Sequence, residues 1–76
     1  MYERITTNPA ILNGKPIIKG TRLSIEFILE YMASGGTIEK FIQTYPQVTQ
    51  VDVQQALLFA ADRLRNEVES TVRIPA

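Results

Sequence analysis

The sequence predicts a mainly α fold: a three-helix, helix-turn-helix-like bundle preceded by a short N-terminal β-hairpin or a pair of extended arms. Two observations predict it. Residues 24–68 repeat apolar side chains at the i, i+3, i+4, i+7 spacing of amphipathic helices, in three stretches separated by Gly or Pro. Residues 1–22 carry short apolar runs and turn residues instead. We expect one domain over 1–69 and a tail at 70–76.

The size and composition of the chain indicate one small globular domain with a limited core. With 76 residues, 45% of them hydrophobic and 21% charged, it is expected to fold as one globular domain. A domain this short buries only about 60% of its unfolded surface, so its core is marginal. Because the chain has no Cys and no His, we expect no disulfide, metal or other cofactor, and a homodimer is the remaining common remedy.

Charge and hydropathy limit the environment. The longest apolar run is only a few residues and MYERITTNPA has no apolar signal core, so we expect no membrane span, no export and a cytoplasmic protein. Eight basic and eight acidic residues give a formal net charge of zero. That balance argues against a generic nucleic-acid binder, although it leaves room for a local basic patch.

The first 22 residues are expected to form the hairpin or arms. Asn13-Gly14 stands between two short apolar runs, and Asn-Gly is the strongest local signal for a tight hairpin turn. Pro16 cannot donate a ladder hydrogen bond, so its strand should be an edge strand. Gly20 should adopt a conformation closed to other residues, because the chain must turn sharply there before the first helix.

Three helices are expected, over 24–34, 38–45 and 50–68. Ser24 and Thr37 are the N-caps predicted for the first two, because a hydroxyl there accepts a hydrogen bond from a backbone N–H of the first turn. Gly and Pro end these two helices.

The third helix begins with a capping box, formed by Thr49 and by Asp52 three residues later. Its predicted buried face consists of Val53, Leu57, Ala60 and Leu64.

The second and third helices, with the turn between them, have the layout of a helix-turn-helix. In a DNA-binding interpretation the third helix reads bases, because Gln pairs with adenine and Thr contacts phosphate or a thymine methyl. Its reading residues would be Thr49, Gln50, Gln54 and Gln55, and the phosphate contacts would be Lys15, Lys19, Arg22 and Lys40. The alternative is a plain helical bundle with a polar face, since no Lys or Arg lies between Lys40 and Arg63.

The basic and apolar residues of the front end also have two interpretations. In the first interpretation, Lys15 and Lys19 protect an edge strand from misassociation and Arg22 pairs with Glu26. In the second, the same three basic residues contact phosphate. Phe27 and Tyr31, four residues apart, form a second core face or a dimer face. The predicted dimer interface comprises Ile17, Ile18, Phe27 and Tyr31.

Catalysis is not expected. The sequence has no Cys nucleophile, no His base and no Gly-rich phosphate loop. The carboxylates lie at helix caps and on exposed faces, where structural roles account for them.

Several stretches resemble a known family: Asn8-Pro9, GKPIIKGTR, Ala33 with Gly35, YPQVT followed by Asp52, and ALLFA. Together they span about residues 4–62 and are similar to the small prokaryotic proteins of the domain-of-unknown-function 433 family. Gly36, Ile38 and Val51 depart from the residues usual there and alter the surface at the helix starts.

The resemblance implies a helix-turn-helix-like trihelical fold with extended N-terminal arms. It also implies an antitoxin of a type II toxin–antitoxin pair, with a PIN-like nuclease as the toxin partner. Our first hypothesis is therefore an antitoxin-like, homodimeric DNA-binding transcriptional regulator that binds operator DNA. The alternative is a homodimeric protein-interaction module of the same fold that does not bind DNA.

Overall fold

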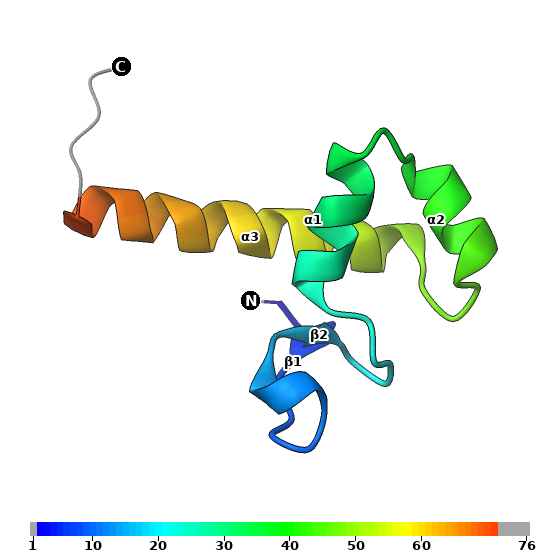
Figure 1. Cartoon of the computed structure of the whole chain (residues 1–76), viewed down its shortest axis with the longest axis horizontal. Helices are drawn as coiled ribbons and strands as arrows, with labels where there is room; N and C mark the ends of the chain where they lie inside the picture. The colour runs from blue at the N-terminus through cyan, green and yellow to red at the C-terminus, as the bar shows by residue number, and fades with distance from the viewer. Residues whose placement is uncertain (1, 72–76) are drawn as a thin grey trace.

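A two-stranded hairpin and three helices follow one another along the chain (Figure 1). The computed structural model describes residues 2–71, with side chains through residue 66. The predicted mainly α fold is confirmed, and within the described residues no helix combines the length and hydropathy needed to cross a membrane. The elements are β1 (Ile5–Thr6), a 3-10 turn (Leu12–Gly14), β2 (Ile17–Ile18), α1 (Ile25–Ala33), α2 (Ile38–Thr44) and α3 (Gln50–Thr71).

The helices begin at the predicted caps. Ser24 Oγ accepts a hydrogen bond from the Phe27 N–H at 2.9 Å, and Thr37 Oγ1 accepts one from the Lys40 N–H at 3.1 Å. The predicted helix ranges agree with the observed ones to within a residue or so for α1 and α2. Helix α3 continues to Thr71, past its predicted end, and residues 72–76 of the predicted tail lie outside the described residues.

The hairpin forms, but its turn differs from the prediction. Antiparallel pairing joins Ile5 to Ile18 and Thr6 to Ile17, so Asn13-Gly14 lies inside a long connection. Asn13 and Gly14 do have positive φ, of 57° and 80°, but Leu12 before them also has φ 50°. Three successive left-handed residues curl into a 3-10 turn and do not make the two-residue loop of a tight hairpin.

The core lies where α1, α2 and the hairpin meet the first half of α3. Its buried apolar side chains are Ile18, Ile25, Ile28, Phe41, Val48, Val53 and Ala56. Ile17 and Ile18 are only 2% and 0% exposed, which corrects the predicted dimer interface: both are buried within their own chain. Their burial is what joins the short hairpin to the helices.

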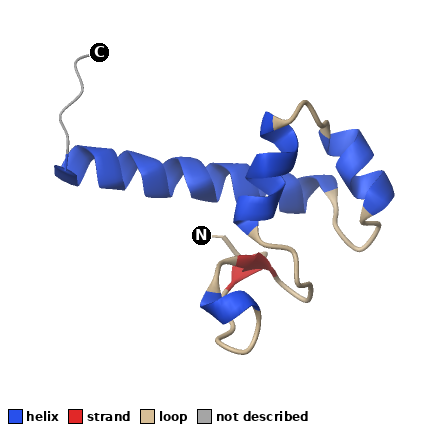
Figure 2. Cartoon of the chain, viewed as in Figure 1, coloured by secondary structure: helices blue, strands red, loops and turns tan. Residues whose placement is uncertain are grey.

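The second half of α3 extends past the other elements (Figure 2). Leu64 is 60% exposed there, so its predicted place on the buried face is wrong. The apolar spacing that includes Leu64 is real, but the body of the domain ends before it can cover that residue. Tyr2 packs along this helix just before that point: its hydroxyl donates to Asp62, and its ring meets Phe59 edge-on at 5.5 Å.

Gly20 occupies the predicted left-handed conformation, with φ 81°, and a Cβ added there would meet open space. Because the strain is in the backbone alone, Gly20→Ala should lower the free energy of unfolding by about 1–2 kcal/mol. Gly20→Asn is the matched control, since Asn tolerates positive φ and should cost less. Urea unfolding of both variants measures this, and an Ala variant as stable as the parent would contradict it.

Candidate functional site

Helix α2, a tight corner and the first turns of α3 form the predicted helix-turn-helix layout. Two buried side chains hold the corner: Phe41 on α2 is 0% exposed, and Val48 in the turn is 2% exposed. The Val48 N–H donates to the Tyr45 carbonyl at 2.9 Å, which closes the turn. Helix α3 therefore leaves the corner in a direction set by packing.

The surface of the first turns of α3 is uncharged. Thr49, Gln50 and Gln54, all predicted reading residues, are exposed. Val51 is 55% exposed beside them, although the sequence argument did not include it among the candidates. These side chains offer amide and hydroxyl hydrogen bonds together with one apolar contact, which are the groups that read base edges.

The acid in this first turn, Asp52, faces inward. Its side chain is 1% exposed and accepts hydrogen bonds from Arg4 Nε at 2.6 Å and from the Thr49 N–H at 3.0 Å. Thr49 Oγ1 in turn accepts from the Asp52 N–H at 3.2 Å, so the predicted capping box is complete. Arg4 brings a positive charge that the sequence argument did not anticipate, and it neutralises the carboxylate.

Burial and pairing have opposite effects on the pKa of Asp52. Burial alone would raise it, because the charged form loses water. The hydrogen bonds from Arg4 and Thr49 and the charge of Arg4 outweigh burial, so the pKa of Asp52 lies below its ordinary value. The carboxylate is therefore ionised at neutral pH, yet it is screened from any ligand of the α3 surface.

Gln55 differs from the other predicted reading residues. It is half-buried, and its Oε1 accepts the Arg4 N–H at 3.2 Å. Since that oxygen already holds the residue before β1 against α3, Gln55 is placed to support the hairpin and is poorly placed to read a base. Its spacing from Thr49 could not reveal this, because the contact comes from a residue 51 positions away.

The predicted phosphate contacts fall into two groups. Lys15 is paired, with Nζ 2.8 Å from Glu26 Oε1, so the suggested pairing of Glu26 with Arg22 is wrong. Lys19, Arg22 and Lys40 are exposed, and among the described side chains none of them forms an ion pair. Lys19 and Arg22 lie in the loop before α1, and Lys40 lies on α2.

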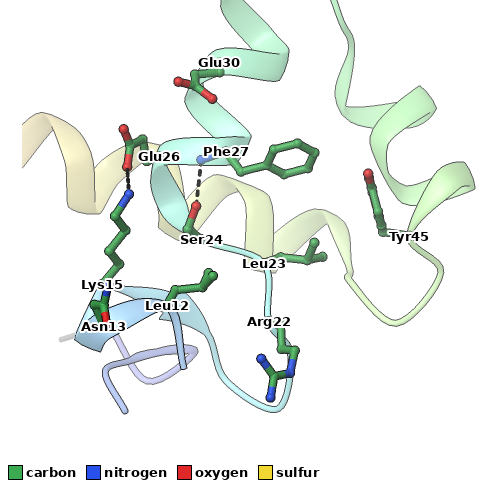
Figure 3. Close-up of a pocket in the computed structure, with 10 residues that line it drawn as sticks. All are labelled: Leu12, Asn13, Lys15, Arg22, Leu23, Ser24, Glu26, Phe27, Glu30 and Tyr45. Carbon is green, nitrogen blue, oxygen red and sulfur yellow. Dashed lines mark hydrogen bonds and ion pairs between the residues drawn. The ribbon is translucent and has the colours of Figure 1, made fainter. Parts of the chain in front are cut away.

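A shallow groove of about 560 Å³ lies between the 3-10 turn, the loop before α1, α1 itself and the end of α2 (Figure 3). Arg22 lines it, together with the apolar side chains of Leu12, Leu23, Phe27 and Tyr45. Leu12 is 43% exposed, although the sequence argument did not single it out. Leu12 lies in the left-handed 3-10 turn, and the only sign of that turn in the sequence was Asn13-Gly14.

The two aromatic residues of the predicted dimer face lie differently. Phe27 is 36% exposed and touches Phe41 and Tyr45, with ring centroids 6.0 and 5.8 Å away. Tyr31 is half-buried and packs edge-on against Phe41 at 5.1 Å. Phe27 therefore offers free apolar surface at the groove, whereas Tyr31 belongs mostly to the core.

The family described as "Protein of unknown function (DUF433)" matches residues 5–60, which include the hairpin, α1, α2 and the first half of α3. The chain is also similar to "Uncharacterized protein y4eO" from Sinorhizobium fredii (strain NBRC 101917 / NGR234), with 28% identity over 58 residues. That alignment covers 76% of this chain and 26% of the relative, so the chain spans about a quarter of that protein's length. No solved structure matches the chain.

Asp52→Ala should lower the free energy of unfolding by about 2 kcal/mol, because it removes a helix cap and leaves the Arg4 guanidinium and the Thr49 N–H without their acceptor. Glu39→Ala, which removes an exposed acid from the first turn of α2, is the control and should change it by no more than about 0.5 kcal/mol. Urea unfolding at pH 7 measures both, and equal effects would contradict the role given to Asp52.

The same contact predicts a dependence on pH. Because the pKa of Asp52 is lowered in the folded state, its stabilisation is present above the ordinary aspartate value of about 3.9 and is lost as the pH falls toward the folded value. The urea midpoint of the parent should therefore fall more steeply than that of Asp52→Ala as the pH is lowered from about 5 to about 2. Parallel curves would contradict this.

Proposed function

The chain belongs to the DUF433 family, and from that premise we propose that it is an antitoxin-like, DNA-binding transcriptional regulator. The observation that carries the proposal is the neutral, hydrogen-bonding surface at the start of α3. The acid that would repel phosphate there, Asp52, is buried and paired with Arg4. Thr49, Gln50 and Gln54 remain exposed on the second helix of a helix-turn-helix layout, which is the helix that enters the major groove in that motif.

The exposed side chains would form two groups, one that contacts bases and one that contacts phosphates. Gln50 and Gln54 would read adenine through their amides, and Val51 would contact a thymine methyl. Lys19 and Lys40, which are free of ion pairs among the described residues, would contact phosphates. Few cations are available, so affinity should depend on specific contacts more than in a strongly basic protein.

The antitoxin part of the proposal rests on the family resemblance. It carries the expectation of a PIN-like nuclease as the toxin partner and of operator DNA near the chain's own gene. The exposed apolar surface of the domain supports a second candidate, a protein-interaction module of the same fold. Its specific basis is the exposure of Phe27, Leu58 and Leu64, at 36%, 60% and 60%, on a small domain.

The test is a salt titration of binding to the upstream region of the chain's own gene and to scrambled DNA of the same length. Lys19→Ala and Lys40→Ala should each weaken binding to both DNAs and reduce the salt slope by about one unit. Gln54→Ala should cost about 1–3 kcal/mol on the preferred site and little on scrambled DNA.

Gln43→Ala is the matched control, because Gln43 is an exposed glutamine that belongs to α2 and not to α3. It should leave both affinities unchanged. If the parent shows no salt-dependent binding to either DNA, the DNA-binding proposal fails and the interaction module becomes the better account.

A further inference from the structure

The groove described above carries opposite charges at its two ends. Figure 3 shows Arg22 at one end and Glu30 at the other, with Leu12, Leu23 and Phe27 between them. Among the described side chains, neither Arg22 nor Glu30 forms an ion pair. The charges that flank the middle, Lys15 and Glu26, neutralise each other at 2.8 Å. Within the described part of the chain, the groove therefore has one free cation, an apolar centre and one free anion.

The apolar centre is held open to solvent by the backbone. Leu12 has φ 50°, a left-handed conformation that L residues rarely adopt, and its side chain is nevertheless 43% exposed. Hydrogen bonds fix this turn, from the Gly14 N–H to the Ile11 carbonyl at 3.0 Å and from the Lys15 N–H to the Leu12 carbonyl at 3.2 Å. The strain is not offset by burial within the chain, which points to a contact outside it.

We infer that a second copy of this chain covers the groove, in a two-fold homodimer centred near Phe27. A two-fold interface uses the same patch on both subunits, so the patch must complement itself. A cation and an anion at opposite ends of an apolar centre satisfy that condition. Arg22 then faces Glu30 of the partner subunit, Glu30 faces the partner's Arg22, and the two Phe27 rings meet near the axis.

Other occupants fit the groove less well. DNA would meet Glu30 on the groove surface, and a uniformly acidic or basic protein would be repelled at one end. Two copies of this chain have no net charge to repel each other, because eight basic and eight acidic residues cancel. A dimer also adds apolar burial to a 76-residue domain whose core is marginal. The inference does not depend on DNA binding.

The competing apolar surface lies on α3, where Val51, Leu58 and Leu64 are 55%, 60% and 60% exposed. None of them lines the groove. Leu58→Glu therefore disrupts the α3 surface without changing the groove. It distinguishes a dimer that forms through α3 from one that forms through the groove.

The experiment is sedimentation equilibrium of the full chain without DNA, with far-UV circular dichroism to verify the fold of each variant. The parent should approach twice 8.6 kDa at micromolar concentration. Arg22→Glu and Glu30→Arg should each weaken the dimer at least about tenfold, because each places like charges together at two symmetry-related positions. Glu39→Arg, an equal charge reversal on α2 outside the groove, should have no effect.

The mixture gives the sharpest result. In a mixed dimer of one Arg22→Glu chain and one Glu30→Arg chain, both end contacts place an acid opposite a base. An equimolar mixture should therefore recover the dimer that each variant alone has lost, and a mixture as weak as either variant alone would contradict the inference. The double variant Arg22→Glu/Glu30→Arg places an acid opposite a base at both contacts, and it should recover as a homodimer to within about threefold of the parent affinity. A monomeric parent, a dimer indifferent to these reversals, or a dimer that only Leu58→Glu dissociates would each overturn the inference.

Discussion

The contact between Arg4 and Asp52 is the interaction on which the rest of the domain depends. Its two ends lie 48 residues apart, and it fixes the hairpin to the first turn of α3. Arg4 contributes three times: its guanidinium pairs with Asp52, its N–H donates to Gln55, and its carbonyl accepts the Lys19 N–H at 2.7 Å. A two-stranded hairpin is marginal by itself, so these contacts and the burial of Ile18 give it a fixed place. Because Asp52 also caps α3, the same carboxylate sets where that helix begins.

This arrangement links stability to the surface that α3 presents. An acid in the first turn of a helix favours helix formation, but on an exposed recognition helix it would repel phosphate. Here the acid retains its helical role while being buried and paired, and only neutral side chains remain outside. The cost is that Gln55 becomes a structural residue. The hairpin thus shapes the start of α3 without having to touch a ligand itself.

Local features were predictable from the sequence, and contacts between distant segments were not. Ser24, Thr37 and the Thr49–Asp52 box lie within three residues of the groups they cap, so their spacing alone identified three helix starts. Gly20 was identified in the same way from the turn that it must make. Arg4 and the strand pairing of Ile5 with Ile18 depend on tertiary packing, which no short motif encodes. Leu64 has the spacing of a core residue but lies beyond the end of the core, so periodicity placed it wrongly. In the candidate site, Gln50 and Gln54 are exposed whereas Gln55 is half-buried. The sequence could not show this difference, because all three residues are glutamines.

The groove and the start of α3 use almost separate residues, and this decides how the two proposals combine. No described residue of α3 lines the groove, so a partner copy can contact the groove without contacting Thr49, Gln50 or Gln54. Arg22 is the exception, because a guanidinium paired with Glu30 of the partner subunit is no longer available to a phosphate. Lys19 and Lys40 then supply about four phosphate contacts in a dimer, which gives weak nonspecific affinity. Discrimination would therefore come from the glutamines and from the spacing of two α3 helices, which must match half-sites about 34–36 Å apart or a multiple of that distance. Dimerisation through the groove would in this way compensate for a recognition helix whose first turns carry no exposed positive charge.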